Sequence, residues 1–378
     1  MKKCVVVSDS FKGTVSSREI CEIAQRVIPR HFPACEVVCI PVADGGEGTV
    51  DCFIQAVDAQ RVEVTVTNAL GEKSAAAYAR LGELAIIEMA AAAGLPQVGA
   101  LRCPGTATTY GVGELIAHAV DSGCRKILLG LGGSATNDGG CGCAAALGVG
   151  FLDADGQSFV PVGDTLGRIA RIDTAEAEAL LRSVEITVMC DVTNPLYGPT
   201  GAAYVFAPQK GADAEKVKSL DAGLRHFGDV IRSQYGLDVS AMPGAGAAGG
   251  MGAGCVALLG GTIQSGIDAV LDVTGFDRQL EGADLVITGE GRIDSQSADG
   301  KVVSGVARRT RAKGVPLIAI AGGIADSAGA VYDIGVSAMF STDRAALPVD
   351  MLGARSPGDY EATLSDIMSL ITIAERFA

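Results

Sequence analysis

The chain has 378 residues, which is long for a single hydrophobic core, so we expect two domains. Hydrophobic residues make up 48% of it and aromatic residues only 4%, a composition typical of buried parallel strands filled with Val, Ile, Leu and Ala. A net charge of −14 offers no basic face, which excludes nucleic acid as a partner. An anionic ligand must therefore be bound locally, by backbone N–H groups and a few cations.

The eleven cysteines do not indicate a disulfide framework or a zinc site, because none forms a C-x-x-C pair. Several, including Cys4 and Cys255, lie inside apolar segments, where a free cysteine behaves as a small hydrophobic residue. No signal peptide and no membrane-spanning apolar run is visible. We expect a cytoplasmic protein with reduced thiols and no membrane partner.

Two strand–loop–helix units open the chain. A strand at residues 3–7 ends in polar residues, and a capping box at Ser16 and Glu19 begins a helix. A second strand at 36–42 ends in the loop ADGGEGT, which a further helix follows. Polar, glycine-containing loops after each strand are typical of a parallel α/β sheet.

The order of predicted elements then changes: short strands follow at 61–68, 75–80 and 84–89, with no helix between them. The first strand alternates valines on one face, so this part predicts an antiparallel meander, which is foreign to a doubly wound sheet. A helix over 108–122 then leads to an apolar strand at 126–131.

The sequence LGLGGSATNDGGCG, at 129–142, is the most polar strand end in the chain. Hydroxyl, amide and carboxylate side chains stand between two pairs of glycines, and helix-prone residues follow. Glycines let a backbone approach a ligand, and a helix N-terminus offers free N–H groups, so this segment predicts an anion site at the carboxyl edge of a sheet. An ordinary Asx-rich turn is the alternative.

The second half contains a strand at 185–190 that ends in DVTNPLYG, the loop FAPQKGA and the glycine cluster PGAGAAGGMGAG. Strands at 284–288, 316–321 and 338–341 return to the α/β pattern, and the loop GEGRIDSQSADGK follows the first of them. We therefore expect one discontinuous domain, of residues 1–60, 106–147 and 280–378, which carries an inserted domain of residues 61–105 and 148–279.

Histidine contributes little to the predicted chemistry, because the chain has only three and each is expected to be structural. Proton transfer falls instead to carboxylates, which recur at the strand ends: Asp9, Asp44, Glu47, Glu88, Asp138, Asp191, Glu290 and Asp294. Most such residues in proteins cap helices or form turns, and this reading stays open for each. The cations in the same loops are candidate phosphate or carboxylate ligands: Lys12, Lys210, Arg292 and Lys301.

Nucleotide-binding fingerprints are incomplete. No Walker A motif is present, and the G-x-G-x-x-G at 244–249 follows a proline instead of a strand. A relaxed form at 130–135 does follow a strand, but the Asn and Asp after it suit phosphate and metal better than a dinucleotide. These features fit Mg²⁺-dependent phosphoryl transfer, in which positioning and charge neutralisation dominate.

Nine motifs occur in one order: SDSFKGT, PVADGGEGT, IEMAAAAGL, TTYGVGELI, GLGGSATNDGGCG, CDVTNPLYG, FAPQKGA, PGAGAAGGMG and VITGEGRIDSQSADGKV. Together they resemble the bacterial class I glycerate kinases over essentially the whole chain. The resemblance implies a flavodoxin-like doubly wound parallel sheet domain with a second mixed α/β domain inserted. It also implies phosphorylation of D-glycerate by ATP, usually to 2-phosphoglycerate. Ser8, Cys141 and Cys143 depart from the family pattern, at positions that carry no assigned role.

Roles are assigned by chemistry within this resemblance. Asp191 is the predicted base or hydroxyl-orienting residue, with Mg²⁺ ligation and turn capping as alternatives, and the predicted anion clamps are Lys12, Lys210 and Arg292. The predicted substrate ligands are Asp9, Ser10, Asp44, Gly45, Gly46 and Glu47. The predicted nucleotide and phosphate ligands are Gly132, Gly133, Ser134, Thr136, Asn137, Gly289, Gly291 and Lys301. The predicted Mg²⁺ ligands are Asp138, Glu290 and Asp294.

Three alternatives remain: phosphorylation at the 3-hydroxyl to give 3-phosphoglycerate, a non-catalytic sugar-acid sensor on the same fold, and a nicotinamide-dependent hydroxyacid dehydrogenase. A sensor would not consume ATP. A dehydrogenase needs an acidic residue at the end of a strand after the glycine loop, whereas Asp44 and Glu47 precede that loop. The sequence leaves open whether identical subunits assemble.

Overall fold

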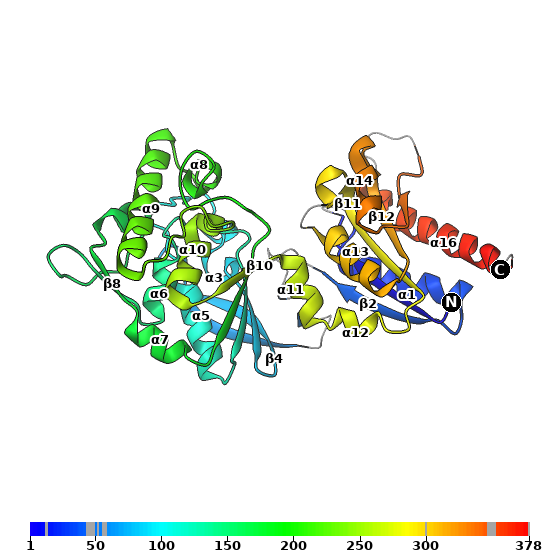
Figure 1. Cartoon of the computed structure of the whole chain (residues 1–378), viewed down its shortest axis with the longest axis horizontal. Coiled ribbons are helices and arrows are strands. Elements are labelled where there is room, and N and C mark those ends of the chain that lie inside the picture. The colour runs from blue at the N-terminus through cyan, green and yellow to red at the C-terminus, as the bar shows by residue number, and fades with distance from the viewer. Residues whose placement is uncertain are drawn as a thin grey trace. The chain divides into compact units, whose positions relative to one another are not determined.

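The computed structural model describes the chain except for residues 12–13, 43–49, 51–52, 55–58, 299–300, 346–352 and 377–378. The chain divides into two compact units, in which the helices and strands are labelled in Figure 1. The first unit comprises Met1–Asp44, Gln55–Val57 and Gly266–Ala378, so both ends of the chain build it. The second comprises Gly45–Ile54 and Asp58–Ser265.

The sheet of the first unit is wholly parallel, with the strand order β13-β12-β11-β1-β2. Its strands are β1 (Lys3–Ser8), β2 (Glu36–Pro41), β11 (Leu285–Ile293), β12 (Leu317–Ile324) and β13 (Ala338–Ser341). Numbered within the unit, this is the order 2-1-3-4-5 of flavodoxin-like doubly wound sheets. The predicted fold class is confirmed for this unit.

Helices cover both faces of this sheet (Figure 1). On one face α1 (Ser17–His31) packs against α16 (Ser356–Ala374), and on the other α13 (Val302–Lys313) packs against α14 (Ala330–Ile334). The capping box predicted at the start of α1 is confirmed: the Glu19 N–H donates to Ser16 Oγ (3.2 Å), and the Ser16 N–H donates to the Glu19 carboxylate (2.9 Å).

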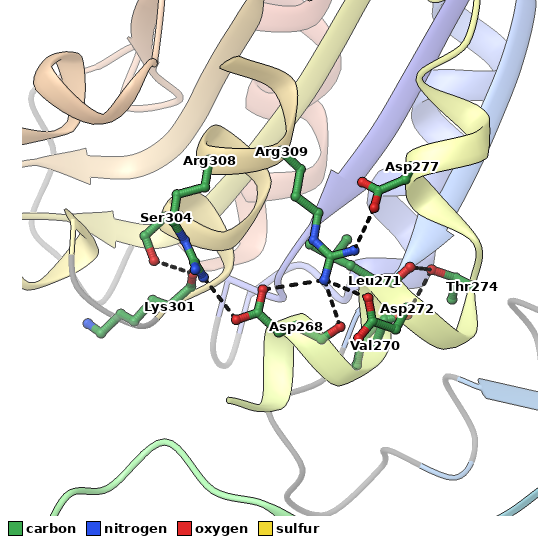
Figure 2. A network of polar contacts seen from close by, with 10 residues as sticks. All are labelled: Asp268, Val270, Leu271, Asp272, Thr274, Asp277, Lys301, Ser304, Arg308 and Arg309. Carbon is green, nitrogen blue, oxygen red and sulfur yellow. Dashed lines mark hydrogen bonds and ion pairs between the residues drawn. The ribbon is translucent and has the colours of Figure 1, made fainter. Parts of the chain in front are cut away.

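An ionic cluster attaches α11 (Gly266–Val273) and α12 (Phe276–Gln279) to α13, as Figure 2 shows. The Arg309 guanidinium forms ion pairs with Asp268 (3.4 Å), Asp272 (2.8 Å) and Asp277 (3.2 Å) and donates to the Asp268 carbonyl (3.1 Å). Arg308 forms a further ion pair with Asp268 (3.0 Å). The cluster therefore fixes α11 and α12, with which the chain returns to the first unit, to α13, which begins directly after Lys301.

The sheet of the second unit is mixed, with the order β10-β9-β6-β5-β4-β3. Its strands are β3 (Gln60–Thr67), β4 (Lys73–Leu81), β5 (Leu84–Glu88), β6 (Lys126–Gly130), β9 (Glu185–Met189) and β10 (Thr262–Gln264). The predicted meander is confirmed, because β4 runs antiparallel to both β3 and β5, while β5, β6, β9 and β10 are parallel. A separate antiparallel pair joins β7 (Gly150–Leu152) and β8 (Arg171–Asp173).

The position of β6 differs from the expected domain division. It is hydrogen-bonded between β5 and β9, so residues 106–147 lie in the second unit and not with the first sheet. The return to the first unit comes at Gly266, earlier than the expected position 280. Both sheets contain parallel strands followed by glycine-rich loops, so the local pattern of β6 does not tell which sheet the strand joins.

Helices pack around this second sheet and enclose its core. They are α3 (Ala90–Ala93), α4 (Leu95–Val98), α5 (Tyr110–Asp121), α6 (Cys141–Ala146), α7 (Ala175–Leu181), α8 (Ala202–Phe206), α9 (Ala214–Tyr235) and α10 (Ala247–Leu259). In the part of the chain that the structure describes, no helix is both long and apolar enough to cross a bilayer.

Candidate active site

The loop that follows β6, residues 131–140, is here called the signature loop. It is held at its start by the segment after β5: the Leu95 N–H donates to the Gly133 carbonyl (2.8 Å), and the Ala135 N–H donates to the Ala93 carbonyl (2.9 Å). Gly133 has a φ of +73°, which favours glycine. The predicted glycine-rich strand end is therefore an ordered loop, hydrogen-bonded to the segment that follows the neighbouring parallel strand β5.

Lys210 reaches the signature loop from η2 (Pro208–Lys210), and only 2% of it is exposed. Its Nζ donates to Ser134 Oγ and to the Thr136 carbonyl, both at 2.7 Å. Burial lowers the pKa of Lys210 to about 7, and the nearby negative charge of Asp138 acts in the opposite direction. The structure thus brings Lys210, a predicted anion clamp, into contact with Ser134 and Thr136, two predicted phosphate ligands.

Asp138 is fully buried, and its carboxylate accepts four hydrogen bonds from the protein itself. Oδ2 accepts from the Thr109 N–H and hydroxyl (both 2.8 Å) and from the Gly142 N–H (3.3 Å), and Oδ1 accepts from the Gly140 N–H (3.1 Å). Burial raises the pKa of Asp138, and these hydrogen bonds oppose the rise. The geometry favours a role in fixing the start of α6 over the predicted Mg²⁺ ligation, because its oxygens already have donors.

Sequence reasoning did not select Thr109, although it opens a helix within the motif TTYGVGELI. Thr109 occupies the N-cap position of α5, but its hydroxyl makes no capping bond to that helix. It instead accepts from the N–H of Cys143 in α6 (2.8 Å) and donates to Asp138. The sequence feature that could have pointed to Thr109 is a hydroxyl residue at a helix start, but ordinary N-capping explains that feature equally well.

The glycine cluster at 243–254 supports the signature loop through its backbone. Residues 248–250 all have left-handed backbone angles within α10. A Cβ on Gly249 would lie 2.2 Å from the Thr136 carbonyl oxygen, and the Gly139 N–H donates to the Gly249 carbonyl (3.0 Å). A Cβ on Gly254 would lie 2.1 Å from the Gly139 carbonyl oxygen. Gly246 is crowded in the same way, by the Pro195 carbonyl oxygen at 2.2 Å, so two glycines of the G-x-G-x-x-G pattern serve close backbone packing.

Two further side chains of the signature loop have buried polar atoms for which the described part of the chain offers no partner. Thr136 Oγ1 and both amide atoms of Asn137 have no hydrogen-bond partner among the described residues, although both residues are fully buried. Leaving such atoms unpaired costs about 1–3 kcal/mol for each group. Buried polar atoms of this kind are commonly satisfied by an ordered water or a ligand.

Asp191 lies just after β9 and is exposed. The loop that it opens is firmly held: the Asn194 amide donates to the Thr200 carbonyl (2.8 Å), the Gly246 N–H donates to the Asn194 carbonyl (3.0 Å), and the Gly198 N–H donates to Asp221 Oδ1 (2.7 Å). Pro195 restricts the backbone of this loop further, because its ring fixes φ and limits the conformation of Asn194. At the end of β5, Glu88 accepts from the Val50 N–H (2.6 Å).

In the first unit the sequence GEGRI belongs to β11, not to a loop as expected. Gly289, Glu290 and Arg292 pair with β12, and a Cβ on Gly289 would lie 2.1 Å from the Ile320 carbonyl oxygen. The glycines therefore reflect the close spacing of neighbouring strands as well as a strand end. Gly291 is half-buried, and Arg292 is exposed, in this same strand.

Glu290 is 7% exposed, and its Oε1 atom is buried with no hydrogen-bond partner among the described residues. Burial raises the pKa of Glu290; a hydrogen bond with Ser297 and the charge of Lys301 lower it, and Asp9 and Asp294 raise it further. The charges that act on Glu290 thus come from other segments of the first unit as well as from its own. Ser10 is tied to this group, since its N–H donates to Asp9 Oδ1 (2.7 Å).

The remaining predicted residues, Lys12, Asp44, Gly45, Gly46 and Glu47, lie outside the described residues. Asp138 belongs to the second unit, whereas Glu290 and Asp294 belong to the first. Across the described ranges, no three His, Cys, Asp or Glu side chains are grouped so that they could hold a metal ion by themselves.

Histidine is structural, as expected. His226 Nε2 contacts the Ile169 carbonyl (2.7 Å), His118 Nδ1 contacts the Tyr78 hydroxyl (3.2 Å), and His31 Nε2 contacts the Ser365 hydroxyl (3.0 Å). Proton chemistry therefore rests on carboxylates or on Lys210 in the part of the chain that is described.

One parallel and one mixed sheet, a buried lysine beside a glycine-rich strand end and a group of carboxylates beside another are typical of α/β enzymes that bind anionic ligands. The model of the glycerate kinase family matches residues 4–372. A glycerate kinase of Bacillus cereus is 45% identical over 99% of both chains, and a glycerate 2-kinase of Escherichia coli is 44% identical over 90% of both. A crystal structure described as glycerate kinase 2 from Salmonella typhimurium LT2 superimposes with a TM-score of 0.88, at 38% identity and 99% coverage of both chains.

The chain belongs to the glycerate kinase family, and it is a phosphotransferase.

Proposed function

We propose that this enzyme transfers the γ-phosphoryl group of ATP to the 2-hydroxyl of D-glycerate, with Mg²⁺ as the metal ion. The observation that carries the proposal is the buried Lys210 ammonium at the signature loop, beside polar atoms of Thr136 and Asn137 that have no partner among the described residues. The choice of the 2-position is supported by the relative named glycerate 2-kinase, at 44% identity.

Lys210 is suited to hold an anionic oxygen. An ammonium group has three donors, and the described residues take up two of them. A third donor can address a phosphoryl or carboxylate oxygen in surroundings where burial strengthens the interaction. Because burial lowers the pKa of Lys210 to about 7, an arriving anion favours the charged lysine and is accompanied by proton uptake when the pH is above that value.

The phosphate-binding roles assigned from the sequence remain proposals. The signature loop offers the backbone of Gly132 and Gly133 and the Ser134 hydroxyl, and the first unit offers Gly289, Gly291 and Lys301. Arg292 and Lys301 are exposed in the structure and keep their cations accessible. Asp9 and Ser10 are half-buried and are proposed to contact substrate, together with the predicted residues at 44–47.

Mg²⁺ fits the carboxylates of the first unit better than Asp138. Glu290 has a buried oxygen without a partner among the described residues, and Asp294 and Asp9 act on it electrostatically. Mg²⁺ is usually bound by one or two carboxylates plus substrate phosphates, so a set of three protein ligands is not required. When bound, the ion neutralises charge that develops on the phosphoryl oxygens. We propose Glu290 and Asp294 as its protein ligands.

Asp191 is the proposed general base. As the glycerate oxygen forms its bond to the γ-phosphorus, the bond from that phosphorus to the β,γ-bridging oxygen breaks and ADP leaves. The hydroxyl proton must go to an acceptor, and the exposed Asp191 carboxylate at the end of β9 can take it. ATP is a cytoplasmic metabolite, and its use in the proposed reaction supports the proposal of a cytoplasmic enzyme.

The direct test is incubation with ATP, Mg²⁺ and D-glycerate, followed by phosphorus NMR. We expect ADP and 2-phosphoglycerate in equal amounts, with no ADP in a control without glycerate. The resonance of 3-phosphoglycerate in place of 2-phosphoglycerate would overturn the regiochemistry alone. Absence of any phosphorylated acid, with intact ATP, would favour a sugar-acid sensor.

A further inference from the structure

Thr109 has a hydroxyl whose hydrogen-bonding direction is completely determined. The Asp138 carboxylate can only accept, so the hydroxyl donates to it (2.8 Å), and the Cys143 N–H can only donate, so the hydroxyl accepts from it (2.8 Å). Thr109 is fully buried and its one hydroxyl proton is donated to Asp138, so the hydroxyl has no donor left for a substrate oxygen. It supplies two of the four donors to Asp138, from its N–H and its hydroxyl.

Asp138 connects this threonine to the substrate-binding lysine. It is part of the signature loop, whose Ser134 and Thr136 hold the Lys210 ammonium. Asp138 is also the charged group that acts on Lys210 among the described residues. Arg102 is a second cation near this position: its guanidinium donates to the carbonyl of Gln209, the residue before Lys210 (3.0 Å), and Arg102 is exposed. A displaced or neutralised Asp138 would therefore leave a buried lysine without its compensating charge.

We propose that Thr109 is a positioning residue, which holds Asp138 ionised and in place and through it keeps Lys210 charged and aimed at the anionic substrate. This inference rests on the proposed function, because it assigns Lys210 to substrate binding. Thr109 differs from an ordinary helix cap in that its hydroxyl serves another helix and a buried carboxylate instead of α5.

The test compares Thr109→Val, which keeps the shape and loses the hydroxyl, with Thr109→Ser, which keeps the hydroxyl. Thr174→Val is the matched control: Thr174 also occupies an N-cap position in the second unit, and its hydroxyl also donates to a carboxylate, that of Glu178 (2.5 Å). Steady-state kinetics with ATP and D-glycerate and thermal unfolding are measured for all three variants.

We expect Thr109→Val to lower kcat/KM roughly tenfold to a hundredfold, as for the loss of a hydrogen bond to a charged group. Thr109→Ser should stay within about threefold of wild type, and Thr174→Val should lose thermal stability with unchanged kinetics. If Thr109→Val and Thr174→Val lose stability equally and neither changes kcat/KM, Thr109 is only a structural residue and the proposal fails.

The pH profile separates positioning from general damage. Lys210 binds an anion only when it is protonated, and weaker compensation by Asp138 lowers its pKa further. The alkaline limb of kcat/KM should therefore move to lower pH in Thr109→Val and remain at the wild-type position in Thr109→Ser. A misfolded fraction would scale activity equally at every pH and leave the limb unmoved, which would contradict the proposal.

Asp138→Asn completes a double-mutant cycle. If Thr109 acts through Asp138, adding Thr109→Val to Asp138→Asn should lower kcat/KM by less than about twofold more. Losses that multiply would overturn the connection between the two residues. A wild-type enzyme inactive with ATP and D-glycerate would instead refute the proposed function, which keeps the two failures distinct.

Discussion

The contact between α10 and the signature loop depends on Gly249 having no side chain. Gly249 has a φ of +69°, and a Cβ there would lie 2.2 Å from the Thr136 carbonyl oxygen and 2.5 Å from the Asn137 Cα. The neighbours are backbone atoms, which cannot rotate away as a flexible side chain can. Gly249→Ala therefore strains the backbone of α10 and pushes on the segment that carries an acceptor of Lys210.

Gly236→Ala is a matched control, because Gly236 ends α9 with the same φ of +69°, but a Cβ there would have no atom within 4 Å. The left-handed backbone costs about 1–2 kcal/mol in both variants. Reduced freedom of the unfolded chain offsets about 0.4–1 kcal/mol of this. Crowding adds about 1–3 kcal/mol for Gly249 alone. We expect a loss of about 1 kcal/mol for Gly236→Ala and about 2–4 kcal/mol for Gly249→Ala.

Urea unfolding gives the two free energies, and steady-state kinetics gives the effect on the site. Gly249→Ala should also lower kcat/KM at least about tenfold, since it displaces an acceptor of a charged group. Gly236→Ala should retain wild-type kinetics. Equal losses of stability in the two variants would refute the reasoning, because the crowding at Gly249 would then contribute nothing.

Four further predictions concern the site. Asp191→Asn should lower kcat by roughly 10²–10⁴-fold at unchanged ATP KM if Asp191 is the base; a raised Mg²⁺ requirement would make it a metal ligand, and normal kinetics would remove it from the mechanism. Lys210→Ala should lower kcat/KM tenfold or more in steady-state assays, by roughly the 1.5–3 kcal/mol of a charge-assisted contact, and a change within twofold would leave this lysine without a role. In the free enzyme kcat/KM should fall as pH rises through the Lys210 pKa of about 7, because deprotonation removes the cation, and a pH–rate profile flat across this range would contradict it. EDTA should abolish turnover reversibly with no change in circular dichroism, since no three His, Cys, Asp or Glu side chains are grouped to hold a structural metal among the described residues; unfolding by EDTA would show a structural metal.

Local patterns predicted the elements that depend on local interactions. The capping box at Ser16 and Glu19, the alternating valines of β3 and the apolar run of β6 each specify backbone conformation from neighbouring residues. Strand partners are set by contacts far apart in the sequence. The assignment of β6 to the wrong sheet follows from this, because its partners β5 and β9 are chosen by the packing of the whole second unit.

Glycines were the least decisive signal for secondary structure, because a glycine can mark either a left-handed turn or close packing between neighbouring strands. In the signature loop Gly133 adopts a left-handed φ of +73°, as a turn requires. Gly289 instead lies inside β11, where neighbouring backbone leaves no room for a Cβ. The sequence GEGRI therefore predicted a loop although it continues a central strand.

Asp138 and Glu290 show that residue type and spacing can locate candidate site residues but do not determine the role of each one. Both are acidic residues near glycines at a polar strand end, and both were predicted to bind Mg²⁺. In the structure Asp138 accepts four hydrogen bonds from Thr109, Gly140 and Gly142, whereas Glu290 keeps a buried oxygen with no donor among the described residues. A carboxylate whose two oxygens both accept hydrogen bonds stabilises the loop, and one with an oxygen that has no donor can receive a cation. The difference depends on donors from α5 and α6 that only the folded chain brings to Asp138.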